Sequence, residues 1–145
     1  MREIKYIPVI FILAYLSYVD LKKREVPDFA VIVLFIYSLF FISNLKESLL
    51  MAGIVFILLM ITSLISSRSI GGGDIKLLTV LAFFMGKDFS MLALPMFVLL
   101  IFSLIYGILK GKGLRHSVPL VPYVFLSYIF YLILEVFSWN LHFLY

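Results

Sequence analysis

The sequence contains no cysteine and unusually little charge. Without Cys, the chain has no disulfide framework, no thiolate nucleophile and no Cys-based zinc site. Charged residues make up 14% of the 145 residues and hydrophobic residues 64%, well above the roughly one half that is typical of soluble domains. The net charge of +4 comes without a basic, aromatic-interleaved soluble surface, so we expect no nucleic-acid partner. The composition predicts an integral membrane protein that is surrounded by the lipid bilayer.

Six apolar segments account for most of the length. Runs of roughly 17–25 apolar residues match a helix that crosses a bilayer, and the breaks between the segments carry charges, Gly and Pro. We therefore predict an all-α fold: a polytopic membrane protein with six transmembrane helices in one bundle, forming a single membrane-embedded domain over residues 1–145. A signal peptide is the competing interpretation of the first segment, but no small-x-small cleavage site follows it. The predicted spans are Ile4–Tyr18, Phe29–Ile42, Leu49–Ile65, Ile75–Met85, Phe89–Leu109 and Val118–Phe137.

Positive charge is distributed unevenly between the two sides of this predicted bundle. Eight of the 12 Lys and Arg residues fall in or beside the first, third and fifth connections, and such a bias marks the cytoplasmic side. The eight are Lys22, Lys23, Arg24, Arg68, Lys76, Lys110, Lys112 and Arg115. This predicts a multi-pass protein of the plasma membrane with both termini outside. Two spans separate Asp20 from Asp74, so both carboxylates belong to the cytoplasmic face.

The segment SIGGGD combines three glycines with an acid at the start of an apolar helix. The apolar run that follows, Ile75–Met85, is too short to cross a core about 30 Å thick, so we expect the segment to enter the membrane as non-helical backbone. Asp74 could simply cap the next helix, and the glycines could simply form the turn. They would also expose a strip of backbone on which an extended peptide could lie. The three glycines are Gly71, Gly72 and Gly73.

Asp20 ends the first predicted span in the segment DLKKREVPD. On its own it could be a solvated acid, balanced by a run of cations that could equally be a topology signal. Together with Asp74 it forms a pair of acids at membrane depth, which is costly and typical of function. When two carboxylates share a site, their repulsion raises the pKa of one, so that one is protonated while the other is ionised. Such a pair can hydrolyse an amide by acid–base catalysis, as in aspartic proteases.

Two prolines mark a third unusual segment, SVPLVPYVF, at the start of the last predicted span. Pro119 and Pro122 fit the first turn of a helix, but they could also stiffen an extended stretch that shapes the wall of a cleft. His116 and His142 fall on opposite faces in the predicted topology. We therefore expect no metal site, and we expect no other cofactor.

Three segments in this order, DLKKREVPD, GGGDIKLL and VPLVPY, resemble the type IV prepilin peptidase family, which includes the archaeal preflagellin peptidases. In that family the first catalytic Asp lies in a D-x-x-x-R-x-(I/V)-P-N segment. The second is the Asp of G-x-G-D, usually followed by Lys, and a P-x-x-P-(F/Y) segment opens the last span. The matching positions are Asp20, Arg24 and Pro27, then Gly71, Gly73, Asp74 and Lys76, then Pro119, Pro122 and Tyr123.

This resemblance implies an aspartic endopeptidase in which Asp20 and Asp74 are catalytic. It also implies the partners: type IV prepilin-like or archaellin precursors, whose basic leader is cut where it meets the cytoplasmic side of the membrane. Asp28 stands where the family more often has Asn. The chain lacks the cysteine-bearing insert of the larger bacterial enzymes, so the resemblance implies a peptidase without a methyltransferase domain.

Two other functions remain open from the residues alone. In a small cation- or proton-coupled transporter or channel subunit, the same acids would bind a cation or relay protons. Such a protein needs a polar path to the outer face, and the outer halves of the predicted spans offer almost no ionisable residues. In a purely structural subunit, Asp74 would only cap its helix, and its Asn variant would retain function.

Overall fold

The computed structural model describes residues 3–65, 71–110 and 119–142. Within these ranges the regular elements are all helical, which confirms the predicted all-α class. The predictions for Arg68, Lys112, Arg115 and His116 lie outside the described residues.

Each predicted span corresponds to one α-helix of the described chain, and the predicted bounds of the fifth, Phe89–Leu109, agree with those observed. One difference affects the site: Gly72, Gly73 and Asp74 form the first turn of a helix. The prediction of non-helical backbone at these three residues is therefore wrong. The elements are η1 (Glu3–Tyr6), α1 (Ile7–Lys23), α2 (Asp28–Phe41), α3 (Leu45–Ile65), α4 (Gly72–Met85), η2 (Gly86–Asp88), α5 (Phe89–Leu109) and α6 (Val121–His142).

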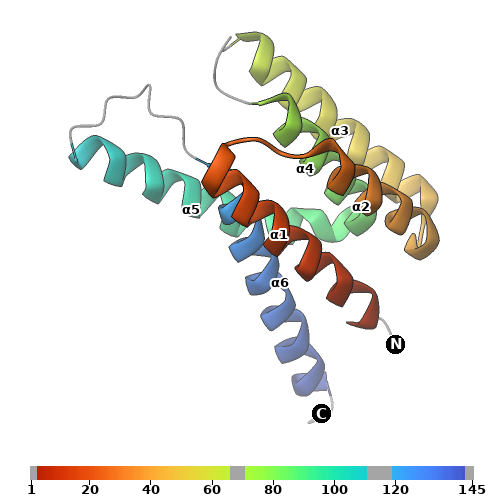
Figure 1. The fold of residues 1–145 in the computed structure, drawn as a ribbon. Helices are drawn as coiled ribbons and strands as arrows, with labels where there is room; N and C mark the ends of the chain where they lie inside the picture. Colours follow the sequence, from red (N-terminus) through yellow and green to blue (C-terminus); the bar gives the residue numbers. More distant parts are fainter. Residues whose placement is uncertain (1–2, 66–70, 111–118, 143–145) are drawn as a thin grey trace.

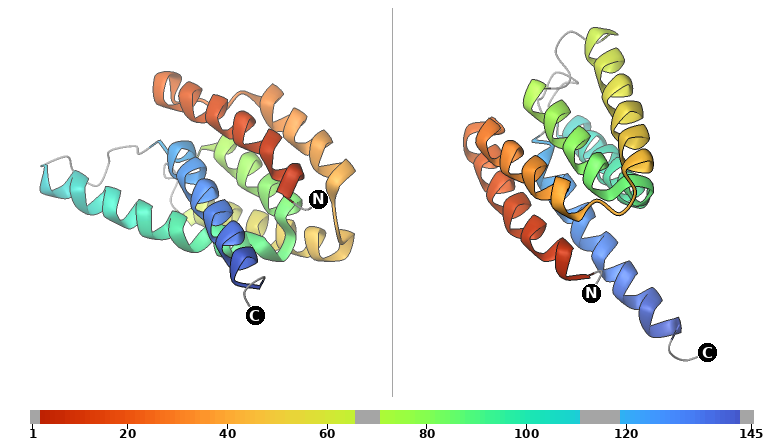
Figure 2. Two further views of the ribbon diagram at one scale, coloured as in Figure 1. Left: turned by 90° about the horizontal axis from the view of Figure 1, so that it is seen from below. Right: turned by 90° about the vertical axis from the view of Figure 1, so that its right-hand side faces the viewer.

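The α4 helix lies between α2 and α3 and packs against both (Figure 1). The α1 helix packs against α6, and α6 packs in turn against α5. Figure 2 shows that α5 and the later part of α6 extend away from the other helices. Contacts between helix ends bring the C-terminal end of α1 together with the N-terminal ends of α2, α4 and α6. The site described below lies at this meeting point.

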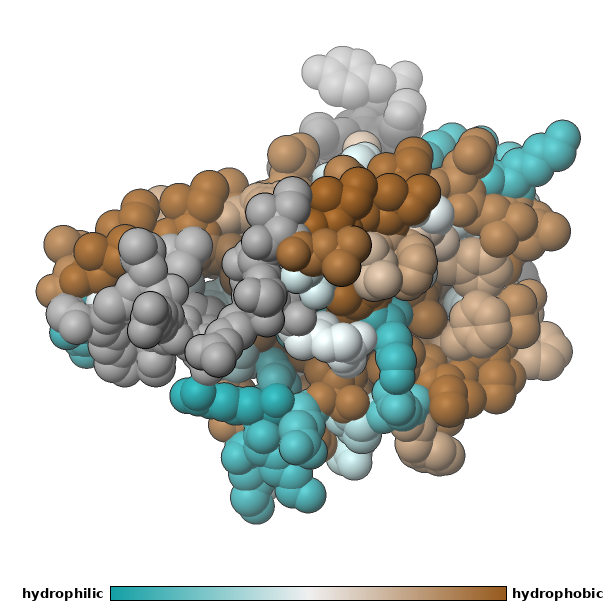
Figure 3. All heavy atoms as spheres, turned by 90° about the horizontal axis from the view of Figure 1, so that it is seen from above, coloured by the Kyte–Doolittle hydropathy of each residue, from teal (hydrophilic) through white to brown (hydrophobic). Residues whose placement is uncertain are grey.

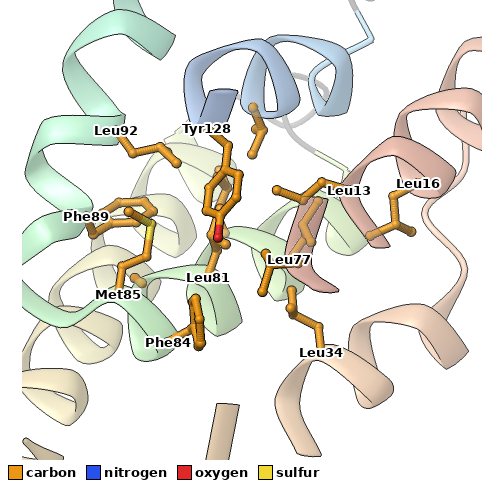
Figure 4. Close-up of a cluster of buried hydrophobic side chains, with 14 of the residues drawn as sticks. Leu13, Leu16, Leu34, Leu77, Leu81, Phe84, Met85, Phe89, Leu92 and Tyr128 are labelled. Carbon is orange, nitrogen blue, oxygen red and sulfur yellow. The ribbon is translucent and has the colours of Figure 1, made fainter. Parts of the chain in front are cut away.

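The core is a cluster of buried apolar side chains supplied largely by α1, α2, α4 and α6 (Figure 4). Leu13, Leu34, Leu81 and Tyr128, one from each of these helices, are 0% exposed. The α4 helix is buried on several sides, including the consecutive residues Leu81–Met85, as expected for a helix that is apolar all round. Its packing therefore fixes the position of its first turn, which carries Asp74.

Apolar side chains also cover much of the outer surface, as the space-filling view shows (Figure 3). Two helical stretches are long and apolar enough to cross a bilayer: Leu45–Leu64, and Gly72–Leu109, which runs through α4, η2 and α5. In the most apolar 18 residues of these two stretches, only 6% and 12% are buried inside the protein. The core helix of a soluble protein would be mostly buried. Two shorter apolar helices are Asp28–Phe41 and Val121–Phe137. These features are consistent with a membrane protein, and the six spans stay a prediction.

A tyrosine cluster joins the beginning of α1 to α6. Tyr6 is 3% exposed, and its backbone carbonyl accepts a 3.2 Å hydrogen bond from the Tyr128 hydroxyl. The Tyr131 hydroxyl donates to the Tyr6 hydroxyl at 3.4 Å. The Tyr6 ring meets both of the other rings edge to face, a favourable arrangement of aromatic side chains. These contacts fix α1 against α6 at the end of α1 that is opposite to Asp20.

Candidate active site

Asp20 lies in the last turn of α1 and is almost completely buried, with 5% of its surface exposed. Its Oδ2 accepts a 3.1 Å hydrogen bond from the backbone N–H of Val121, the first residue of α6. The first N–H groups of a helix have no partner within the helix, and they lie at the positive end of the helix dipole. The start of α6 therefore offers a favourable environment to the Asp20 carboxylate.

The backbone of Asp20 is held by the residues that end α1. Arg24 follows the helix in the left-handed conformation, with φ 54° and ψ 35°, and its N–H donates to the Asp20 carbonyl at 2.8 Å. A left-handed residue often closes a helix in this way, although Gly is the usual choice. Pro27 then precedes α2, and its carbonyl accepts a 3.1 Å hydrogen bond from the Ala30 N–H. Asp20 is thus fixed through both its main chain and its side chain.

Asp74 is the third residue of α4 and its side chain folds back onto the start of the helix. The carboxylate accepts a hydrogen bond from the Gly71 backbone N–H, and the Asp74 N–H donates to the Gly71 carbonyl at 3.0 Å. A side chain at the third helical position that binds the residue before the helix is one half of a capping box. Asp74 therefore caps α4. This hydrogen bond leaves its charge in place, so capping and acid–base chemistry are compatible.

The structure brings Asp20 and Asp74 close enough for their charges to interact. Asp20 comes from the end of α1 and Asp74 from the start of α4. Asp20 lies against the N-terminal end of α6, and Asp74 lies at the N-terminal end of its own helix, α4. The positive ends of the two helices offset part of the repulsion between the carboxylates. Two neighbouring carboxylates held at helix N-terminal ends are compatible with an acid–base pair.

The three glycines before Asp74 have different surroundings. A Cβ atom on Gly73 would lie 2.8 Å from the Cβ of Val26, and one on Gly71 would lie 3.3 Å from Oδ2 of Asp74. Gly72, by contrast, has none of the described atoms within 4 Å of such a Cβ. The connection between α1 and α2 therefore covers part of the strip that the sequence suggested would be open.

Lys76 connects this end of α4 to α2. Its Nζ lies 2.9 Å from Oδ1 of Asp28, the first residue of α2. The two side chains are 58% and 64% exposed, so the ion pair contributes little to stability. It shows, however, that the first and second motif segments meet at the same end of the molecule.

The proline segment contributes backbone to the site. Pro122 is the second residue of α6, as the helix-initiation interpretation predicted, and Pro119 lies two residues before the helix. Val121 supplies the N–H that reaches Asp20, and the sequence analysis did not identify it. Pro122 does mark where a helix begins and hence where free N–H groups lie, but the sequence does not show which residue those groups reach.

Exposed cations lie beside the site at the end of α1. Lys22, Lys23 and Arg24 at the end of α1 are exposed, and Figure 3 shows hydrophilic side chains in the lower part of the face seen from above and others at its upper right. In the part of the chain that the structure describes, no three residues among His, Cys, Asp and Glu are placed to hold a metal ion. The groups that the described site offers for chemistry are the two carboxylates and the backbone amides around them.

The fold and the site define a helical protein with largely apolar outer faces and an acid pair where several helix ends meet. The chain belongs to the type IV leader peptidase family, whose sequence profile matches residues 7–134. The match spans all three motif segments and confirms the family that those segments indicated. Comparison with curated proteins and with solved structures found no match. Membership of this family makes the chain a peptidase, and thus a hydrolase.

Proposed function

We propose that the chain is an aspartic endopeptidase in which Asp20 and Asp74 form the catalytic pair. The observation that carries the proposal is the position of both carboxylates where the end of α1 and the connection after it meet the first turn of α4, in a chain that belongs to a peptidase family. Each carboxylate also has a hydrogen-bond partner on the backbone, Val121 for Asp20 and Gly71 for Asp74. Defined positions of this kind favour catalysis, because the reacting groups need not be ordered during the reaction.

The proposed reaction uses one ionised and one protonated carboxyl group. The ionised group removes a proton from a water molecule as the water oxygen attacks the carbonyl carbon of the scissile amide. The protonated group gives its proton to the carbonyl oxygen, which produces a neutral tetrahedral diol. When the diol collapses, the C–N bond breaks, one carboxyl group protonates the departing nitrogen and the other takes a proton from a diol hydroxyl. The pair then again holds one proton, ready for the next water.

The proposed substrates are prepilin-like or archaellin precursors, which have a short basic leader followed by an apolar helix. The family's name supports a leader as the segment removed. The position of the pair also supports it, because Asp20 and Asp74 lie at one end of apolar helices, where a bond at the boundary between leader and membrane helix would meet them. A substrate of this kind needs no soluble binding domain.

We also propose six membrane spans, one for each α-helix, with the acid pair at the cytoplasmic face and both termini outside. The distribution of Lys and Arg supports this orientation. The α4 helix has 14 residues, and about 21 Å of helix is shorter than a hydrocarbon core of about 30 Å. Asp74 would therefore lie below the level of the headgroups, or the bilayer would thin around it. Either arrangement brings the leader boundary to the pair.

The test is cleavage of a tagged prepilin-like precursor in membranes, followed by the shift in its size on a gel. Asp20→Asn and Asp74→Asn retain side-chain size but cannot exchange the catalytic proton, so both should abolish cleavage at matched expression. Asp28→Asn is the control, since it removes an acid from the same end of the molecule without touching the pair. The proposal fails if either pair variant cuts at a rate close to that of the wild type.

The same variants distinguish catalysis from capping. Asn retains a side-chain oxygen that can accept the hydrogen bond from the Gly71 N–H, so Asp74→Asn should leave the thermal unfolding temperature in detergent nearly unchanged. Loss of cleavage without loss of stability would support a catalytic Asp74. If Asp74→Asn loses both cleavage and thermal stability, the result would instead favour a structural subunit, in which Asp74 serves only as a cap.

A further inference from the structure

The hydrogen bond between Val121 and Asp20 is the direct link in the described site between the last helix and a carboxylate of the pair. We propose that the backbone N–H of Val121 is the positioning group for Asp20. It holds Oδ2, and Oδ1 is then the oxygen that faces the water and the substrate. This inference rests on the proposed function, because it assigns a role to Val121 in the reaction of that same pair.

The start of α6 makes this N–H available. Tyr123 donates its N–H to the Leu120 carbonyl at 3.0 Å, and Val124 donates to the same carbonyl at 3.2 Å. Pro122 has no N–H at all. Of the first three residues of α6, Val121 is therefore the one whose N–H points to another element, and it points to Asp20.

The donor is also rigid. Val121 is 0% exposed, and its N–H belongs to a backbone whose direction is fixed by the first helical turn. A side-chain donor at this place would have to lose rotational freedom to hold the same carboxylate. The acceptor is equally confined, because Asp20 is 5% exposed and its own carbonyl is held by Arg24. Hydrogen bonds to charged groups are among the stronger ones in proteins, so this bond can set the orientation of the Asp20 side chain.

Contacts elsewhere along the two helices keep the bond in register. The tyrosine cluster formed by Tyr6, Tyr128 and Tyr131 joins α1 and α6 at the other end of α1. With one contact near each end of α1, neither helix can slide along the other without breaking one of them. The Val121 N–H is thus held at a constant distance from Asp20, which is what positioning for catalysis requires.

Two substitutions at Val121 separate the N–H from the side chain. Val121→Pro removes the N–H, retains much of the side-chain volume, and is compatible with the first position of a helix. Val121→Ala retains the N–H and removes buried methyl groups. If the N–H positions Asp20, Val121→Pro should lower kcat by at least about tenfold with little change in KM. Val121→Ala should cost no more than about threefold in kcat, although it lowers the unfolding temperature more.

A backbone ester makes the test independent of proline. Replacing Val121 with its α-hydroxy acid analogue during cell-free translation changes the N–H to an oxygen and retains the side chain. The ester variant should show the same fall in kcat as Val121→Pro. The positioning role is overturned if the ester variant keeps kcat within about threefold of the wild type, or if Val121→Ala loses as much kcat as the ester variant.

The same assay distinguishes failure of this inference from failure of the proposed function. Wild type, Asp20→Asn and Asp74→Asn are measured alongside on the tagged prepilin-like precursor. If the wild type does not cut, or if an Asn variant does, the aspartic peptidase proposal fails and this inference fails with it. If the wild type cuts, both Asn variants are inert and the ester variant retains its rate, only the positioning role of Val121 fails.

Discussion

The Cβ atom of Val26 lies 2.8 Å from the place that a Cβ on Gly73 would occupy. Atoms of neighbouring residues do not normally come so close, so the contact between the α1–α2 connection and the first turn of α4 depends on the missing side chain of Gly73. The α1–α2 connection follows directly after the turn that carries Asp20, and Gly73 precedes Asp74 in the chain. The Val26–Gly73 contact therefore sets the distance between the two parts of the chain that carry the acid pair.

Gly73→Ala should destabilise the protein and abolish most of its activity. The added methyl group forces α4 and the connection apart, and overpacking of this kind typically costs about 1–3 kcal/mol. Thermal unfolding in detergent measures the loss of stability, with Gly72→Ala as the matched control, because its methyl group meets open space. Adding Val26→Gly to Gly73→Ala should restore part of the stability. A Gly73→Ala protein as stable as Gly72→Ala would contradict the packing described here.

Gly71→Ala should affect activity more than stability. The new Cβ would lie 3.3 Å from Oδ2 of Asp74, so the carboxylate must move by a few tenths of an ångström while the backbone, with φ −69° and ψ 143°, accepts Ala readily. Misplacement on this scale should lower kcat by about threefold to tenfold. Steady-state cleavage together with an unfolding curve tests this. A large fall in unfolding temperature would show that Gly71 serves the fold instead.

Arg24→Gly should give a more stable protein than Arg24→Ala. Both variants lose the Arg side chain and all of its contacts, but only Gly adopts φ 54° without steric cost, a difference of about 1 kcal/mol. The two unfolding temperatures measured under the same conditions provide the comparison. Equal stabilities would mean that the end of α1 relaxes from the left-handed conformation when the side chain is removed.

Breaking the ion pair between Lys76 and Asp28 should have only a small effect. Both side chains are more than half exposed, and such pairs contribute about 0.2–1 kcal/mol, less at high salt. A double-mutant cycle with Lys76→Met and Asp28→Asn, measured by thermal unfolding at two salt concentrations, gives the coupling energy. A coupling well above about 1 kcal/mol that persists at high salt would show that the pair is more protected than its exposure indicates.

Hydropathy located the helices because an apolar run must be buried in protein or lipid, but it could not locate every helix end. Phe89–Leu109 was predicted correctly because Gly86 and Lys87 precede it and Lys110 follows it. The first span was expected to end at Tyr18, yet α1 continues to Lys23. The polar residues after Tyr18 suit a loop as well as a helix, and the contact between Asp20 and α6 is a tertiary interaction that no local pattern encodes.

The predicted topology put Asp20 and Asp74 on one side, because an even number of predicted crossings separates them, and the structure places the two residues at the same end of the molecule. Val26 and Val121 could not be identified in this way. Val26 acts through the position of its Cβ, and Val121 through a backbone N–H that every residue except proline carries. Their roles depend on distances between segments far apart in the chain, and only the folded structure provides these distances.

Asp20 and Val121 are 101 positions apart in the chain, and this separation has a consequence for synthesis. A ribosome adds about 5–20 residues per second, so at least about five seconds pass between the two residues. During that time α1 can enter the membrane and α4 can bring Asp74 beside it, but Asp20 has no N–H from α6 to hold it. In the proposed mechanism, the nascent chain therefore holds both acids before Asp20 is oriented, and the proposed precursor substrates meet a complete site only after α6 has been made.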